Sequence, residues 1–163
     1  MRIIAIDPGY ERLGIAVIEK EASSRKETLL YSDCFKTSAK LPFPARLREI
    51  GLEIERLVAK HAPKALAIET LFLSSNQKTA MKVSEVRGAI VYIAAKHGLA
   101  IYEYSPLSIK IATTGYGRSS KEQMISMIPR LIKITKEIAH DDEYDAIAVG
   151  ITCIASAAGR LHS

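Results

Sequence analysis

Four carboxylates stand far apart in this chain, and each lies where an apolar segment ends or begins. Asp7 closes one apolar run, Glu69 closes another, and the pair Asp142 and Asp145 opens a third. A single Asp at such a position is more often a turn residue or a helix cap. Acids on separate segments can instead meet in the fold, and four of them together could hold metal ions.

The spacing and the types of these residues indicate a particular chemistry. Asp142 and Asp145 are three residues apart, so on a helix their side chains project from one face. Crowded carboxylates raise one another's pKa unless a divalent cation or a proton relieves the repulsion. Oxygen ligands without His or Cys favour Mg²⁺, with Mn²⁺ as a substitute, over zinc. Two such ions about 4 Å apart can activate a water against a phosphodiester and stabilise the leaving oxygen.

The elements that must bring the acids together follow from the hydrophobic pattern. Apolar runs predict strands, and apolar residues at intervals of three and four predict helices. Strands are expected at 2–7, 13–18, 29–35, 65–69 and 100–104, and helices at 44–61, 77–96 and 107–112, from about 121, and at 141–158.

This order of elements predicts an α/β fold. The first three strands form an antiparallel meander, and the later strands add parallel neighbours, which gives a mixed sheet of five strands with helices on both faces. Open sheets of this kind bind ligands near strand ends. Asp7 and Glu69 would lie there on neighbouring strands, with the start of the helix at 141–158 against them. The 163 residues are expected to form a single nuclease domain, 1–163.

The amino-acid composition indicates what kind of molecule the protein binds and in which compartment it is found. Lys and Arg number 23 against 18 Asp and Glu, and the pI is about 9.2, so an anionic partner such as nucleic acid is plausible. Cys34 and Cys153 are too few for a disulfide framework or a Cys zinc site. No stretch approaches the roughly 20 apolar residues that cross a bilayer. We therefore expect a soluble, unprocessed, cytoplasmic protein with no membrane partner.

Three motifs in a fixed order resemble a known family. They are Ile6-Asp7-Pro8-Gly9 with Gly14 after it, Ala67-Ile68-Glu69 followed by Phe72, and Asp142 with Asp145-Ala146-Ile147-Ala148. Further matching positions are Pro44-Ala45-Arg46-Leu47, Asn76, Ala80, Lys82, Arg87, Gly88, and Gly115-x-Gly117 followed by Lys121. Together they resemble the RuvC family of Holliday-junction resolvases, within the ribonuclease-H-like superfamily, over nearly the whole chain. Ser119, where the family usually has Ala, and a short tail after Gly159 are the departures.

The resemblance implies a ribonuclease-H-like fold, a homodimer, and Mg²⁺-dependent cutting of two strands at a four-way DNA junction during recombination and repair. A branch-migration complex is a possible further partner. Carried over by position, the four acids become the metal-binding catalytic residues, with two ions in each active site. Lys121 joins them as a catalytic residue that stabilises charge on the phosphate, and Lys110 lies near the phosphate. The positions expected to contact DNA are Phe72, Asn76, Lys78, Lys82, Arg87, Lys110, Arg118 and Lys121.

Several of these roles have a plainer alternative. The lysines could simply be solvated, and Phe72 could belong to the core instead of stacking on unpaired bases. The apolar face of the helix at 77–96 could pair with a second copy or pack in the core. His140 precedes the acidic pair, but metal-activated water does not need it, so we expect no direct role.

Three other functions compete with junction cleavage. An actin-like ATPase would need a second half of the same fold and more Gly-rich nucleotide loops than Gly115-x-Gly117 provides. A junction-binding module without catalysis would have no need of all four acids. A nuclease of the same fold that cuts RNA or an RNA–DNA hybrid is the nearest rival, because two-metal hydrolysis is indifferent to the sugar until a contact reads the 2′-hydroxyl.

Overall fold

The computed structural model describes the whole chain except residues 22–23, 25, 72–76 and 161–163, and its centre is one sheet. The strands are β1 (Arg2–Asp7), β2 (Arg12–Glu19), β3 (Glu27–Lys36), β4 (Ala65–Glu69), β5 (Ala100–Tyr104) and β6 (Ile132–Lys133). The helices are α1 (Phe43–His61), α2 (Gln77–Lys96), α3 (Pro106–Thr114), α4 (Lys121–Leu131) and α5 (Asp141–Arg160). No helix in the described part of the chain is long and apolar enough to cross a membrane.

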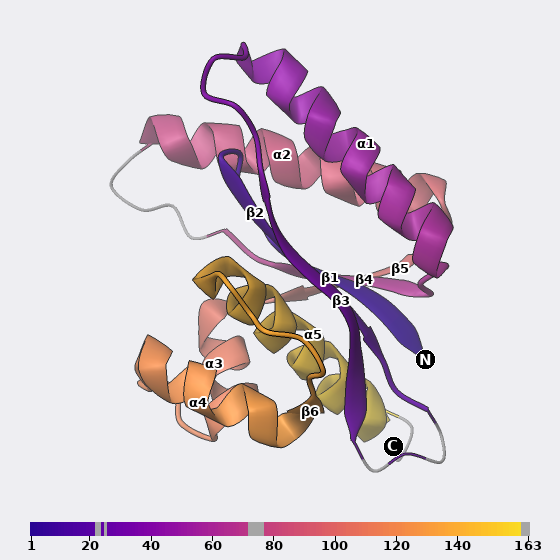
Figure 1. The fold of residues 1–163 in the computed structure, drawn as a ribbon, viewed down its shortest axis with the longest axis vertical. Coiled ribbons are helices and arrows are strands. Elements are labelled where there is room, and N and C mark those ends of the chain that lie inside the picture. The colour runs from indigo at the N-terminus through magenta and orange to yellow at the C-terminus, as the bar shows by residue number, and fades with distance from the viewer. Residues whose placement is uncertain (22–23, 25, 72–76, 161–163) are drawn as a thin grey trace.

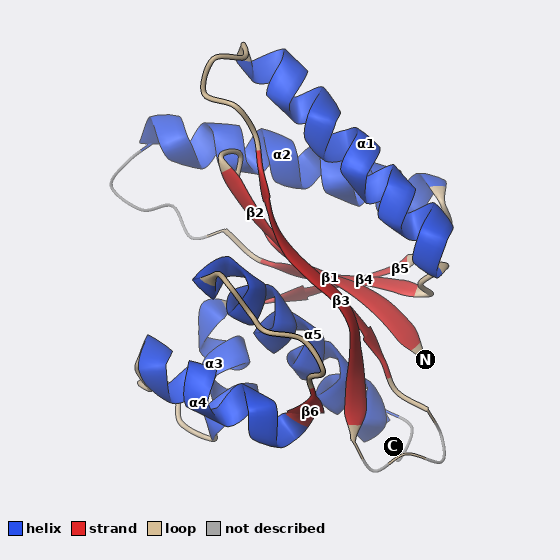
Figure 2. Cartoon of the chain, in the orientation of Figure 1, coloured by secondary structure: helices blue, strands red, loops and turns tan. Residues whose placement is uncertain are grey.

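The strands follow the order β5-β4-β1-β2-β3-β6 across the sheet, which is drawn in red in Figure 2. β1, β2 and β3 form the predicted antiparallel meander, and β4, β5 and β6 each pair in parallel with a neighbour. The predicted count of five strands was wrong, because β6 adds a sixth at the edge beside β3. With only Ile132 and Lys133, β6 is too short to show the alternation from which strands are predicted.

Helices cover both faces of the sheet, with α1 and α2 on one side and α3, α4 and α5 on the other (Figure 1). Side chains alternate along each strand, so β1 sends Ile4 and Ile6 toward α1 and α2 and sends Ile3 and Ala5 toward α5. The apolar stripe of α2, which includes Val86, packs inside the first of these layers. The structure therefore supports the interpretation that this stripe packs in the core, and not that it pairs with a second copy of the chain.

The face of the sheet under α5 carries several small residues beside Ile3, Ile18 and Leu29. It includes Ala5, Ala16, Ala65 and Ala67, where the opposite face carries mainly Ile, Leu and Val. A Cβ added at Gly150 of α5 would lie 2.5 Å from Cδ1 of Ile18 and 3.2 Å from Cβ of Ala5. Small side chains therefore let α5 lie close against β1 and β2, which it contacts along much of its length.

Gly14 of β2 is the closest point of this approach to the start of α5. A Cβ there would collide with the backbone oxygen of Asp142 and would lie 3.1 Å from Cβ of Asp7. Since both obstacles belong to backbone or to a buried strand, the neighbours cannot move aside easily. Gly14 thus allows the first turn of α5 to rest on the strand next to Asp7.

Replacing Gly14 with Ala should lower the free energy of unfolding by about 2 kcal/mol, the usual cost of overpacking a filled interior. Chemical denaturation of the purified protein measures it. Gly51→Ala is the matched control, because a Cβ there meets only Cδ1 of Ile93 at an ordinary 3.5 Å. The control should be neutral or slightly stabilising, since Ala favours the helix. Equal stability of both variants would show that α5 does not depend on the close contact.

Candidate active site

Strand pairing brings two of the predicted acids together. β1 and β4 run parallel with Ile6 opposite Ile68, so Asp7 and Glu69 follow side by side at the same end of the sheet. Ala5, two residues before Asp7, points into the core under α5, and the same alternation holds in β4. Both acids therefore face the α5 layer at the carboxyl ends of parallel strands, where open sheets usually bind ligands.

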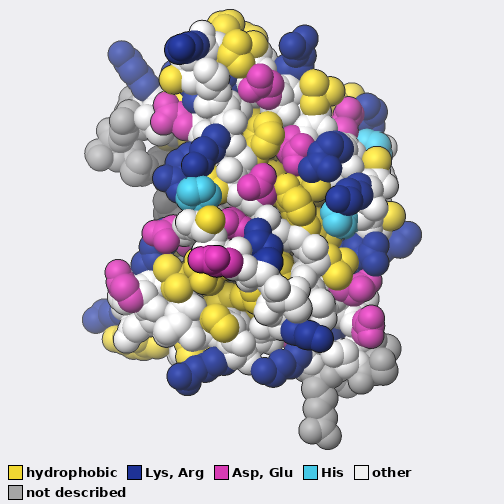
Figure 3. All heavy atoms as spheres, in the orientation of Figure 1, with side chains coloured by type: hydrophobic (Ala, Val, Ile, Leu, Met, Phe, Trp, Pro, Cys, Tyr) yellow, Lys and Arg dark blue, Asp and Glu magenta, His cyan; other side chains and the backbone are white. Residues whose placement is uncertain are grey.

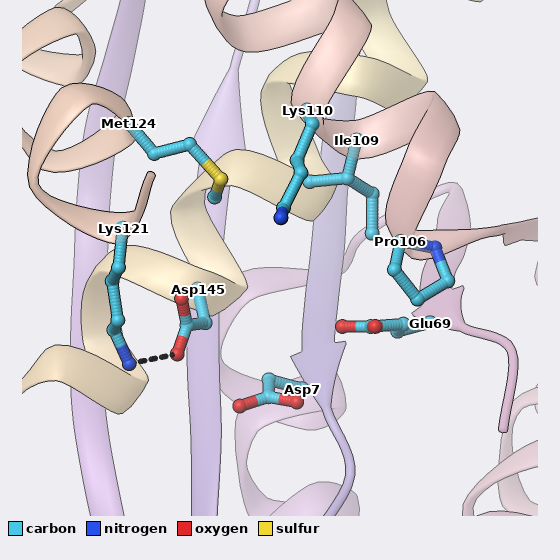
Figure 4. Close-up of a pocket in the computed structure, with 8 residues that line it drawn as sticks. All are labelled: Asp7, Glu69, Pro106, Ile109, Lys110, Lys121, Met124 and Asp145. Atoms are coloured by element: carbon cyan, nitrogen blue, oxygen red, sulfur yellow. Dashed lines mark hydrogen bonds and ion pairs between the residues drawn. The ribbon is translucent and has the colours of Figure 1, made fainter. Parts of the chain in front are cut away.

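A pocket on this side of the sheet gathers three of the predicted acids and two of the predicted lysines. The carboxylates of Asp7, Glu69 and Asp145 point toward one space (Figure 4). Lys110 reaches the pocket from α3, and Lys121 reaches it from α4. The other lining residues are Pro106, Ile109 and Met124. One polar site is thus assembled from β1, β4, α3, α4 and α5.

Lys121 supplies positive charge beside these acids. Ser120 and Gln123 form a capping box at the start of α4 and place Lys121 in its first turn. The Nζ of Lys121 donates a hydrogen bond to Oδ2 of Asp145 over 2.9 Å and lies 3.6 Å from Oδ2 of Asp141. Burial acts to lower the pKa of Lys121, but its bond to Asp145 and the nearby acids outweigh burial and raise that pKa. Lys121 therefore stays charged and offsets part of the repulsion.

The crowding of the acids is strongest at Asp7. The pKa of Asp7 is raised to about 8, mainly because its carboxyl group is buried. The charges of the three other acids, Asp145 first, raise this pKa further, and Lys121 offsets only part of the effect. Burial and the charge of Asp145 also raise the pKa of Glu69. The pocket therefore disfavours the ionised forms of Asp7 and Glu69 while Asp145 is charged, even beside its two lysines.

Asp142 lies at the edge of the cluster, outside the pocket lining. Its Oδ2 accepts a hydrogen bond from the guanidinium of Arg12 and lies 3.5 Å from Sγ of Cys34. Burial acts to raise the pKa of Asp142, but its own backbone N–H, Arg12 and Cys34 outweigh burial and keep that pKa low. Asp142 is still close enough for its charge to raise the pKa of Asp7. Its counter-charge in this structure is Arg12.

The donor set of the pocket suits a hard divalent cation. It offers carboxylate oxygens and includes neither His nor Cys, the chemistry that favours Mg²⁺ or Mn²⁺. Within the described residues, no three side chains of His, Cys, Asp or Glu are already grouped closely enough to hold an ion. Lys121 and Arg12 hold Asp145 and Asp142 instead. Binding of a cation would therefore require these two carboxylates to be shared or released.

Comparison with known proteins assigns the chain to a family. A family model described as crossover junction endodeoxyribonuclease RuvC matches residues 3–153. The chain belongs to the RuvC family. It is 42% identical over 151 residues to the RuvC of Alkaliphilus metalliredigens, with 93% of this chain and 91% of that protein covered. It is 36% identical over 162 residues to the RuvC of Caldicellulosiruptor saccharolyticus, with 99% and 97% covered.

A solved structure supports the same assignment. Thermus thermophilus RuvC in complex with a Holliday junction substrate matches this structure with a TM-score of 0.89 at 28% sequence identity, covering 96% of this chain and 94% of that one. The predicted ribonuclease-H-like fold class and the predicted RuvC family are both confirmed. The RuvC family consists of metal-dependent nucleases, which agrees with the carboxylate pocket.

The predicted DNA-contacting residues of this RuvC chain fall into distinct settings. Lys110 and Lys121 line the pocket, and Lys78 and Arg118 are exposed. Phe72 lies outside the described residues, as does Asn76. Their roles stay predictions.

The two remaining positions already have partners on the protein. The Nζ of Lys82 lies 5.0 Å from the ring centre of Tyr10 and 5.9 Å from that of Phe43. The guanidinium of Arg87 pairs with Glu103 over 2.6 Å. These contacts weaken the interpretation of Lys82 and Arg87 as simply solvated, and neither contact tests binding to DNA.

The basic surplus of the sequence is not gathered into one patch on the face seen in Figure 3. Lys and Arg side chains are spread around this face and alternate with Asp and Glu. Net charge alone therefore does not locate a DNA surface. Of the cations predicted to contact DNA, Lys110 and Lys121 are the ones that line the pocket with the acids.

Two residues near the acids were missed from the sequence. Arg12 pairs with Asp142 from 130 positions away, and no local pattern marks such a partner. Glu143 stands beside Asp142 and is buried, with its pKa lowered by Lys136 and Ser32 although burial acts in the opposite direction. The position of Glu143 among acids at a helix start is visible in the sequence. Solvated acids are common in first helical turns, however, so the position alone does not indicate burial.

The raised pKa of Asp7 predicts how metal-free stability depends on pH. Because this pKa is higher in the folded protein than the ordinary 3.8, the stability linked to it is complete below about pH 4 and is lost as pH rises through about 8. Asp7→Asn removes the charge, so it should match the wild type near pH 4 and exceed it increasingly up to pH 9. We expect a gain on the order of 5 kcal/mol at the higher pH.

Denaturation in a chelator at both pH values measures this difference. The exposed Glu85 of α2 provides the control, because Glu85→Gln should not show such a pH-dependent gain. A wild type that is as stable at pH 9 as Asp7→Asn would mean that the acids are less crowded than the structure indicates.

Proposed function

We propose that this chain is a structure-selective endonuclease that resolves four-way (Holliday) DNA junctions by metal-dependent hydrolysis of phosphodiester bonds, in recombination and repair. Membership of the RuvC family supports the reaction class, and the relative from Thermus thermophilus was solved with a Holliday junction substrate. The observation that carries the proposal is the meeting of Asp7, Glu69 and Asp145 with Lys121 in one pocket of this fold. The whole chain 1–163 acts as one nuclease domain in this proposal.

The four acids are proposed as the metal ligands. Asp7, Glu69 and Asp145 would bind Mg²⁺ in the pocket, and Mn²⁺ could substitute for it. Asp142, which pairs with Arg12 in this structure, would bind the metal as well once that ion pair is shared or released. When two such ions are bound, they supply an activated water and stabilise the leaving oxygen of the phosphodiester. The raised pKa of Asp7 supports this role, because the carboxyl lacks a sufficient counter-charge of its own.

Lys121 and Lys110 are proposed to bind the phosphate of the substrate. Lys121 and Lys110 enter the pocket from the α3 and α4 side, opposite the strand ends that carry Asp7 and Glu69. An ammonium group in that place can bind a phosphate oxygen and stabilise the negative charge that develops as the bond breaks. In this structure Lys121 also donates a hydrogen bond to Asp145, which holds its ammonium group at the pocket.

Two cuts at one junction require two active sites, so we propose a homodimer in the cytoplasm that makes paired nicks and leaves 5′-phosphate ends. The buried stripe of α2 is used by the core, but Met81 and Tyr92 of the same helix are 65% and 69% exposed. Large apolar side chains exposed on one helix are a plausible surface for a second copy. A branch-migration complex would be a further partner of that dimer.

Purified protein with Mg²⁺ should cut a four-way junction and should leave a linear duplex and an RNA–DNA hybrid of the same sequence intact. Asp145→Asn should reduce cutting by at least about 100-fold and keep junction binding, because it removes ligand charge without removing the basic surface. Gel analysis of end-labelled strands measures cutting, and a mobility shift without Mg²⁺ measures binding. Equal cutting of all three substrates would remove junction selectivity, and preferred cutting of the hybrid would favour the rival nuclease.

Lys121→Met should lower the single-turnover cutting rate about 100-fold, the effect of losing one donor that stabilises transition-state charge. Junction affinity should change only a few-fold, since one phosphate contact among many is lost. Lys60→Met is the control, because Lys60 is exposed at the end of α1 in the opposite helix layer. If Lys121→Met and Lys60→Met cut at the same rate, Lys121 serves only to balance charge in the resting protein.

A further inference from the structure

Glu143 lies between two of the proposed metal-binding acids, yet it is turned into the protein. Its side chain is 3% exposed, and of the Asp and Glu residues that the structure describes it is the least exposed to solvent. A carboxylate in such a place is costly unless it is paired and hydrogen-bonded. Its partners therefore explain why the chain keeps it there.

Both oxygens of Glu143 are fully used. Oε2 accepts hydrogen bonds from Oγ of Ser32 over 2.6 Å and from Nζ of Lys136 over 2.7 Å. Oε1 accepts from the backbone N–H groups of Ala139 over 3.1 Å and His140 over 3.3 Å. The same Nζ of Lys136 also donates to the backbone oxygen of Ser32 over 2.8 Å.

These contacts join three parts of the chain at one carboxylate. Ser32 belongs to β3, Lys136 belongs to the segment between β6 and α5, and Glu143 sits in the first turn of α5. Helix ends are less secure than helix interiors, and in a first turn the N–H groups lack partners within the helix. Here a buried, fully satisfied carboxylate ties that turn to the sheet, and such a network allows little freedom of position.

Asp142 is one residue before Glu143, and Asp145 is two residues after it. Their direction is set by the rotation of the first turn about the helix axis and by its height over the sheet. Gly14 lets the turn approach β2, but close contact alone does not fix rotation. The bonds of Glu143 to β3 and to the preceding segment supply that second restraint.

We propose that Glu143, with Lys136 and Ser32, is a positioning residue that fixes Asp142 and Asp145 for metal binding. Glu143 is not among the residues that line the pocket, and in this proposal it acts through the first turn of α5. The inference rests on the proposed function, because it takes Asp142 and Asp145 to be ligands.

Glu143→Gln tests the proposal, since it keeps the size of the side chain and removes the charge that holds Lys136. Without DNA, the Mg²⁺ concentration at the midpoint of the metal-induced rise in melting temperature should increase about tenfold, the usual effect of losing a residue that orients metal ligands. The Mg²⁺ midpoint for junction cutting should move equally, and high Mg²⁺ should recover much of the rate. Junction affinity without metal should stay within about twofold.

Lys136→Met should shift both midpoints in the same direction. The double variant Glu143→Gln with Lys136→Met should be little worse than Glu143→Gln alone, because the two residues act as one unit. The neighbouring Glu137 is exposed, so Glu137→Gln is the control and should leave both midpoints unchanged. Ser32→Ala removes a single donor, and it provides a milder test if Glu143→Gln fails to fold.

A lower melting temperature with unchanged Mg²⁺ midpoints in the folded variants would overturn the proposal. Glu143 would then stabilise the fold without orienting the metal ligands. Failure of the proposed function looks different. In that case the wild type itself would show no metal-induced rise in melting temperature, or Asp145→Asn would cut junctions as well as the wild type does.

Discussion

The close contact of α5 with one face of the sheet is the constraint on which the site depends. Alanines line that face, and glycines stand at the two nearest points, Gly14 on β2 and Gly150 on α5. Larger side chains would lift the helix, and the acids in its first turn would move away from Asp7. Packing in the core and geometry at the site are therefore set by the same few small residues.

Charge balance is the second constraint. Asp7 and Glu69 have raised pKa values because burial and neighbouring acids disfavour their charged forms. Lys121 offsets Asp145, and Arg12 offsets Asp142, so the resting protein contains its own partial counter-ions. A divalent cation bound here would relieve the remaining repulsion between the acids, once Lys121 and Arg12 share or release Asp145 and Asp142.

The RuvC assignment and the pocket support one another but answer different questions. Similarity over residues 3–153 places the chain in a nuclease family. The structure shows which of the predicted side chains line one pocket. It also shows which is paired outside that pocket, as Asp142 is with Arg12. The buried network of Glu143 adds a feature outside the pocket, through which the fold can control the direction of two acids.

The sequence by itself determined most of the elements, because hydrophobic periodicity depends on local spacing alone. Hydrophobic periodicity predicted β1, β4, β5 and the starts of α4 and α5 correctly. Residue type and motif order, which are also properties of the sequence, identified the acids that meet in the pocket. Strand β6 was missed, because its two residues show no pattern.

Only the tertiary structure decided which partners each acid has. Arg12 reaches Asp142 across 130 positions, and Ser32 reaches Glu143 across 111, so neither pairing leaves a local trace. Whether the apolar stripe of α2 faced the core or a second copy was likewise settled by packing, because both surfaces exclude water and select the same residue types.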